Sequence, residues 1–158
     1  MRYTGDSSWH RPYARANGES EQEFGYGTGE GTVTGETLQG TLTWVNTPRR
    51  REDGVWEPDL RGFIKAADGA ELLVFLNGLS IDGDSPEPRR SIVGHVNLVT
   101  EHEPLRWINT CFLVGEGEID PRMLQWWIDV YVCVNDNVKY SPAIGAQPPE
   151  RFRQGTAR

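Results

Sequence analysis

Seven segments of this sequence have the composition and the periodicity of β-strands, and short turns separate them. Each segment combines alternating apolar side chains with β-branched or aromatic residues, and Gly, Pro or Asp residues stand between the segments. No periodic helix of ten residues or more is visible. The pattern predicts an all-β fold, a single antiparallel up-and-down β-barrel of about seven or eight strands with at most one short helix. The predicted strands are residues 24–34, 37–46, 55–66, 71–79, 90–100, 107–114 and 125–134.

The segments on either side of these strands predict the domain organisation. Residues 1–22 mix charged and polar side chains and are interpreted as a flexible N-terminal arm. Residues 23–140 form the predicted barrel domain, and residues 141–158, which contain three prolines and several arginines, form an irregular C-terminal tail. Within the barrel, Asp68-Gly69 predicts a two-residue type I′ hairpin turn, because glycine accepts a positive φ. Asp120-Pro121 predicts a helical turn before the last strand.

Length and charge limit the class of protein. The chain has 158 residues, 16 basic and 23 acidic side chains and a formal net charge of −7. Because binding of nucleic-acid phosphates needs a basic surface, this balance argues against a nucleic-acid partner. The longest apolar runs, such as residues 72–76, are far shorter than the roughly 20 residues of a membrane span, and no secretory signal is visible at the start. We therefore expect a cytoplasmic protein with no membrane partner.

The sequence contains no recognisable metal or cofactor motif. His-x-His, Cys-x-x-Cys and His-Glu-x-x-His are absent, and no phosphate-binding loop or Gly-x-Ser-x-Gly turn occurs. Cys111 and Cys133 are expected to be free thiols rather than a disulfide. We therefore expect no metal and no cofactor.

Glycines occupy every second position at the start of the first predicted strand, from Gly25 to Gly31. Because side chains alternate between the two faces of a strand, one face of this segment carries no side chains. Each glycine costs roughly 0.5–1 kcal/mol relative to alanine in a strand, so a close approach should compensate. We favour a sharp bend covered by aromatic side chains over a bound ligand.

The segment 55–66 leaves two orientations open. Asp59 and Arg61 share one face, and Leu60 and Ile64 share the other. If the apolar side chains point inward, the charged face is an ordinary solvated surface, and the pattern alone slightly favours this. If the charged side chains point inward they must be paired, because a buried isolated charge costs several kcal/mol. An inward Asp59–Arg61 pair could hold a polar group of a substrate.

Some predicted strands are apolar on both faces. Leu73 and Phe75 alternate with Leu72 and Leu76, and the segment 107–114 is similar. Since one face of each strand packs inside the barrel, something must cover the other face, and a second subunit is the simplest cover. We therefore expect a homo-oligomer.

Ordered motifs over roughly residues 25–134 carry a resemblance to a known family. The chain resembles a family of small proteins catalogued as domain of unknown function 3237. The resemblance implies a closed antiparallel β-barrel, similar in architecture to allene oxide cyclase and lipocalin-like barrels, with an internal cavity. It also implies that Asp59 and Arg61 point into that cavity. The motifs are Gly40 with Trp44, Asp53-Gly54, Asp59-Leu60-Arg61, Asp68-Gly69-Ala70, Asn77-Gly78-Leu79, Trp107-Ile108-Asn109 and Val114-Gly115-Glu116-Gly117.

These observations favour a cofactor-independent enzyme, an isomerase, cyclase or lyase that acts on an apolar or aromatic metabolite by acid–base and electrostatic catalysis. The predicted catalytic residues are Asp59, Arg61 and His95: Arg61, oriented by Asp59, stabilises developing negative charge, and His95 moves the proton. The alternative is a non-catalytic small-ligand-binding or assembly protein, and an outward Asp59–Arg61 pair would favour it. The predicted substrate-binding residues are Trp44, Phe75, Asn77, Trp107, Asn109, Asp129 and Tyr131.

Overall fold

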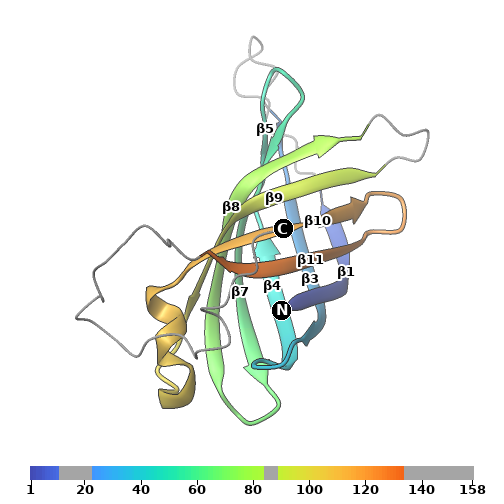
Figure 1. Ribbon diagram of the computed structural model, residues 1–158. Helices are drawn as coiled ribbons and strands as arrows, with labels where there is room; N and C mark the ends of the chain where they lie inside the picture. The colour runs from blue at the N-terminus through green and yellow to red at the C-terminus, as the bar shows by residue number, and fades with distance from the viewer. Residues whose placement is uncertain (11–22, 84–88, 134–158) are drawn as a thin grey trace, which may run out of the picture.

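The structure, a computed structural model, describes residues 1–10, 23–83 and 89–133 (Figure 1). These residues form strands and one short 3₁₀ helix, η1. Among them, no helix is long and apolar enough to cross a membrane. The elements are β1 (Arg2–His10), β2 (Glu23–Phe24), β3 (Tyr26–Thr34), β4 (Gly40–Asn46), β5 (Arg49–Arg50), β6 (Trp56–Glu57), β7 (Asp59–Ala66), β8 (Glu71–Asp82), β9 (Arg90–Val99), η1 (Glu103–Thr110), β10 (Phe112–Asp120) and β11 (Gln125–Cys133).

Eight of the strands close into an antiparallel barrel, which confirms the predicted fold class. Their order around the barrel is β8-β7-β4-β3-β1-β11-β10-β9, and β9 pairs with β8 to complete the ring. The short strands β2, β5 and β6 extend one end through β8, and η1 lies at the other end (Figure 1). Closure gives each of the eight strands two neighbours, so no long edge is left open.

Strand β1 lies where the sequence analysis expected a flexible arm. It pairs with β3 on one side and β11 on the other. Arg2 fixes it to β11: its guanidinium donates two hydrogen bonds, of 2.8 and 2.6 Å, to the Asp129 carboxylate and lies 4.9 Å from the ring centre of Trp127. Tyr3 is buried in the core. The segment has little strand character of its own, so partners far away in the sequence decide its structure.

The rest of the predicted domain division falls outside the described residues. The described residues do not include residues 11–22, which are the remainder of the predicted arm, or residues 141–158, which are the predicted tail.

Helix η1 replaces the first half of the strand predicted at residues 107–114. Pro104 lies in its first turn, where a missing N–H costs nothing, and Leu105 and Ile108 are three residues apart and both buried. Asn109 fixes the helix to the end of β9, because its side chain accepts from the N–H of Thr100 at 2.9 Å and donates to the carbonyl of Thr100 at 2.9 Å. Strand β10 begins after the helix.

Two predicted turns are confirmed in place but differ in type. Asp68-Gly69 lies in the β7–β8 hairpin, where only Gly69 has a positive φ, of 89°. A type I′ turn needs positive φ at both central residues, so that prediction is wrong. At Asp120, the carboxylate accepts the N–H groups of Arg122 and Met123, and the residues there form turns without a helix.

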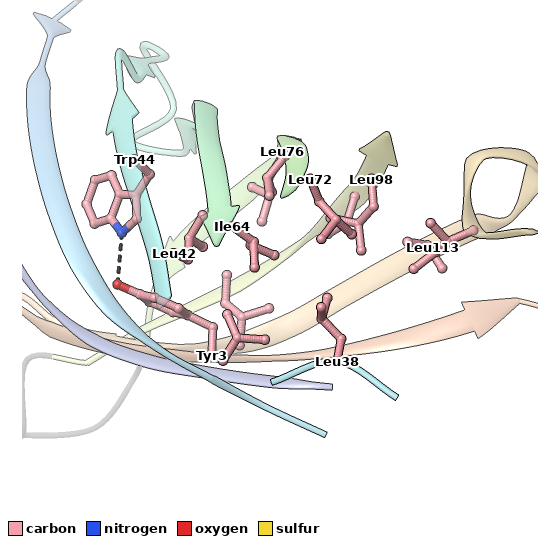
Figure 2. Close-up of a cluster of buried hydrophobic side chains, with 14 of the residues drawn as sticks. Tyr3, Leu38, Leu42, Trp44, Ile64, Leu72, Leu76, Leu98 and Leu113 are labelled. Carbon is pink, nitrogen blue, oxygen red and sulfur yellow. Dashed lines mark hydrogen bonds between the residues drawn. The ribbon is translucent and has the colours of Figure 1, made fainter. Parts of the chain in front are cut away.

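Apolar side chains from all sides of the barrel fill its middle (Figure 2). The most deeply buried are Ile64, Leu72, Leu98, Leu113 and Val33. Toward one end the packing becomes aromatic. Trp44 donates from Nε1 to the Tyr3 hydroxyl at 2.9 Å, and the Trp126 ring lies 4.9 Å from Trp44 and 4.6 Å from Tyr3. The barrel therefore has a packed core through its centre rather than one open chamber.

At Gly31, on the glycine face of β3, another strand and an aromatic side chain come close to the backbone. A Cβ built on Gly31 would lie 2.4 Å from the carbonyl oxygen of Thr4, 2.5 Å from the Cα of Gly5 and 2.7 Å from the Tyr3 hydroxyl. The tight approach of β1 and the packing of Tyr3 explain why this position carries no side chain. The aromatic cover agrees with the favoured interpretation, but Tyr3 comes from the neighbouring strand.

Replacing Gly31 by alanine is expected to lower the free energy of unfolding by about 2–3 kcal/mol, because the new methyl group meets backbone atoms that cannot move aside. Gly115→Ala is the matched control. Its Cβ would lie 3.0 Å from methyl groups of Ile128 and Val96, which can shift, so we expect a change within about 1 kcal/mol. Urea denaturation measures both, and equal losses would contradict the packing described for Gly31.

Candidate functional site

A cavity of about 130 Å³ lies at the end of the barrel opposite η1, and we call it the mouth cavity. The ends of β4, β8 and β10 meet there with the starts of β7, β9 and β11, so the ring of strands itself forms the wall. The lining is mostly apolar and aromatic. Its apolar side chains include Trp44, Trp56, Leu60, Leu76, Ile92 and Trp126.

Two buried polar atoms in this wall have no hydrogen-bond partner among the described residues. They are the hydroxyl oxygen of Ser80 and the indole Nε1 of Trp126. Ser80 is 3% exposed and Trp126 is 7% exposed. Leaving such a group buried and unpaired costs about 1–3 kcal/mol. A molecule in the cavity that accepts hydrogen bonds would restore both interactions, since an indole N–H only donates and a hydroxyl can donate or accept.

Arg90 is the only ionisable side chain that lines the mouth cavity among the described residues. Its Nε donates to the carboxylate of Asp82 at 2.5 Å, and its guanidinium lies 5.3 Å from the ring centre of Trp56. The carboxylate therefore balances the positive charge of Arg90 at the rim. The cavity has an electrically neutral, low-polarity interior, and two of its hydrogen-bonding groups have no partner among the described residues.

The predicted catalytic pair lies on the outside of the barrel. Asp59 and Arg61 approach to 3.8 Å, and their side chains are 43% and 68% exposed. Leu60 and Ile64 occupy the inner face of β7, where they are buried. The inward orientation implied by the family resemblance is therefore wrong, and the solvated orientation that the pattern alone favoured is correct.

His95, the third predicted catalytic residue, is also on the outer surface. Its ring stacks on that of Phe112 with centres 4.7 Å apart. It lies across the strands from Asn77, whose amide donates to Asp59 at 3.2 Å. Phe75 is half-buried on the same outer face. The structure thus brings Asp59, Arg61, Phe75, Asn77 and His95 together, but away from the mouth cavity.

The other predicted substrate-binding residues lie in three separate places: at one end of the barrel, at the other end, and on its outer surface. Trp44 lines the mouth cavity. Trp107 and Tyr131 line a second cavity of about 470 Å³ next to η1. Asn109 fixes η1 to β9. Asp129 binds Arg2 on the outer surface, and the hydrogen bonds from Arg2 hold the pKa of the Asp129 carboxyl below its ordinary value.

The Arg2–Asp129 ion pair makes stability depend on pH. Because the pKa of Asp129 is lowered in the folded chain, its contribution is present above the ordinary pKa of about 4 and is lost as the pH falls through the lowered value. We therefore expect Asp129→Asn to lose less stability than the wild type between neutral and acidic pH. In the double variant Arg2→Met with Asp129→Asn, the free energy of unfolding should depend on pH in nearly the same way as in Asp129→Asn alone. Parallel profiles for wild type and Asp129→Asn would contradict the assignment.

Apart from Trp44, the residues that shape the mouth cavity were absent from the predicted site. Trp126 stands on the purely apolar face of the last predicted strand, which is a signal of an inward position. Ser80 lies one residue beyond the predicted end of the strand at 71–79. Arg90 is the first residue of the strand predicted at 90–100 and carried no sign of an inward position. These side chains become neighbours because the ends of several strands come together in the barrel. No local sequence pattern shows that arrangement.

No family model and no curated protein matches the sequence. The resemblance to domain of unknown function 3237 therefore stays a prediction. Solved structures do match. A protein of unknown function from Clostridium acetobutylicum is 17% identical, with a TM-score of 0.70 over 83% of this chain and 93% of that one. A β-barrel-like protein from Acinetobacter baumannii is 15% identical, with a TM-score of 0.67 over 83% and 90%.

One of the similar structures is described as an enzyme. It comes from Penicillium herquei and is 19% identical, with a TM-score of 0.54 over 81% of this chain and 90% of that one. At these identities the matches establish a shared small β-barrel fold, and the site must be argued from this chain's own residues.

Proposed function

We propose that the protein binds a small, uncharged and mainly apolar molecule in the mouth cavity, a single aromatic ring that carries an oxygen acceptor. The observation that carries this proposal is the pair of buried polar atoms, Ser80 Oγ and Trp126 Nε1, which have no partner among the described residues and lie in a mostly apolar wall. Convergent polar groups in an apolar pocket are typical of small-molecule sites.

Size supports a single ring. An apolar cavity of roughly 150 Å³ engineered in another protein binds benzene, and the mouth cavity is about 130 Å³. Three indole rings, those of Trp44, Trp56 and Trp126, face it and can contact a flat ligand edge-on or face-on. A larger ligand would need the wall to open.

Charge supports an uncharged ligand. An anion could pair with Arg90 only in competition with Asp82, which already binds the guanidinium at 2.5 Å. Its own loss of hydration would also cost several kcal/mol in such a wall. A phenolic, carbonyl or ether oxygen accepts hydrogen bonds without that cost.

The same lining favours binding over acid–base catalysis. General acid–base catalysis needs a titratable group within hydrogen-bond reach of the substrate. Among the described residues of the wall only Arg90 is ionisable, and its guanidinium is already bound to the Asp82 carboxylate. The non-catalytic alternative of the sequence analysis is therefore the function we propose.

Calorimetric titration with three probes tests the proposal. Phenol is expected to bind with a dissociation constant of about 0.1–1 mM. Benzene has the same ring without the acceptor and should bind about fivefold more weakly, since one net hydrogen bond is worth about 1 kcal/mol. Benzoate should bind most weakly because of its charge. Equal affinities for phenol and benzene, or tighter binding of benzoate, would contradict the proposed ligand class.

Two further expectations remain predictions. They are the cytoplasmic location and the homo-oligomer.

A further inference from the structure

An uncharged strip runs along the outer face of β8 and β9. It consists of the outward side chains at odd positions 73–81 and 91–99, which form five cross-strand pairs from Leu73–Val99 to Ile81–Ser91. None of these ten positions is Asp, Glu, Lys or Arg. We call this surface the outer strip.

The outer strip exposes large apolar side chains to solvent. Leu73 and Val93 are each 48% exposed, Ile81 is 46% exposed and Leu79 is 39% exposed. Next to it on β10, Phe112 is 57% exposed and stacks on His95. A contiguous apolar surface of this kind on a strand pair is typical of an interaction site, because an antiparallel barrel wall facing water normally alternates with charged residues.

Charges of opposite sign stand at opposite corners of the outer strip. On the β7 side, Arg61 pairs in register with Phe75, and its side chain is 68% exposed. On the β10 side, Glu116 pairs in register with Val93 and is exposed. The Asn77–His95 pair lies between these two registers, near the middle of the strip.

This arrangement is complementary to itself. Consider a two-fold axis that lies in the plane of contact, passes through the Asn77–His95 pair and runs diagonally to the strands. This axis brings Arg61 of each copy opposite Glu116 of the other copy, which gives two equivalent ion pairs. The strands of the two copies then cross at nearly a right angle, which is one of the two common ways in which sheets pack. Phe75, Leu79 and Val93 surround the polar Asn77–His95 pair where the two strips cross, and the ion pairs lie at the rim.

We infer that the outer strip is the interface of a homodimer in which Arg61 of each copy faces Glu116 of the other. The strip is roughly 30 Å long, from about nine residues at 3.3 Å each, but two strips that cross at a right angle meet only over their central parts. That size corresponds to the smaller class of protein interfaces, so we expect dissociation in the micromolar range. The interface lies on the barrel wall, so this inference does not depend on the ligand proposed for the mouth cavity.

Sedimentation velocity of the full chain at tens of micromolar tests the surface. The wild type is expected to be a dimer and Val93→Lys a monomer, because the lysine places two like charges in the interface. Thr32→Lys is the matched control: Thr32 is exposed on β3, across the barrel, and its variant should stay dimeric. A monomeric wild type, or a Val93→Lys variant that remains dimeric, would overturn the inference.

Charge reversal tests the orientation. Arg61→Glu should weaken the dimer at least tenfold, since it places two carboxylates opposite each other. The double variant Arg61→Glu with Glu116→Arg should recover most of that loss, because the pairs are restored with reversed sign. Near-ultraviolet circular dichroism of each variant reports whether the barrel is intact. A folded double variant as weak as Arg61→Glu would overturn the proposed pairing.

Discussion

Replacing Ile64 by alanine is expected to lower the free energy of unfolding by about 3–5 kcal/mol, among the largest effects of any single truncation in this barrel. Ile64 is fully buried at 0% exposure and lies in register between Leu42 on β4 and Leu72 on β8. Strands on either side are fixed by the closed ring, so the wall can collapse only partly into the space left behind.

Lys65→Ala is the matched control for this prediction. Lys65 is the next residue along β7 and is exposed on the outer face, so its truncation should change stability by less than about 0.5 kcal/mol. Urea denaturation of both variants gives the comparison. Similar effects at the two positions would contradict the inward orientation of the apolar face of β7.

Replacing Ser80 by leucine is expected to reduce phenol affinity about 100-fold or more while leaving the barrel as stable as the wild type, or more so. The larger side chain fills much of the 130 Å³ mouth cavity. It also removes a buried hydroxyl that has no partner among the described residues, which lifts a cost of about 1–3 kcal/mol. A gain in stability with a loss of binding is characteristic of a position kept for function.

Thr43→Leu is the control for the cavity-filling variant. Thr43 is exposed on the outer face of β4, next to Trp44, so the same apolar side chain there should leave phenol binding unchanged. Calorimetry measures binding, and thermal unfolding measures stability. Unchanged phenol affinity in a folded Ser80→Leu variant would place the ligand somewhere other than the mouth cavity.

The strands and the closed barrel could be predicted because their signal is local. Alternation along residues 37–46 and 125–134 fixes which side chains point inward, and Trp44 and Trp126 both follow it. A strand that forms only because neighbouring strands pair with it has no alternation of apolar side chains that could predict it. Strand β1 is polar and glycine-containing, and only its pairing with β3 and β11 defines it.

The orientation of β7 follows the alternation of its side chains and not the family resemblance. The alternation of Leu60 and Ile64 with charged residues correctly favoured an outward Asp59–Arg61 pair, and the family resemblance pointed the other way. The physical reason favours the pattern. Burying two large aliphatic side chains stabilises the fold by several kcal/mol. Burying an ion pair removes both charges from water, and the attraction between the two charges often only offsets this desolvation penalty.

The mouth cavity could not be predicted in the same way. Its wall combines Trp56, Ser80, Arg90 and Trp126, which come from four different strands and lie up to 70 residues apart. The unsatisfied state of Ser80 and Trp126 is a property of the packed barrel and has no counterpart in any segment of sequence.

The most direct test is the indole N–H resonance of Trp126 during a phenol titration, observed by nitrogen–proton correlation NMR and assigned with Trp126→Phe. We expect a saturable downfield shift, because the indole gains a hydrogen bond that none of the described residues provides. Trp127, the neighbouring residue that lies beside Arg2 on the outer surface, provides an internal control and should not move. A Trp126 resonance that stays fixed while phenol binds, or that moves no more than that of Trp127, would contradict the proposed site.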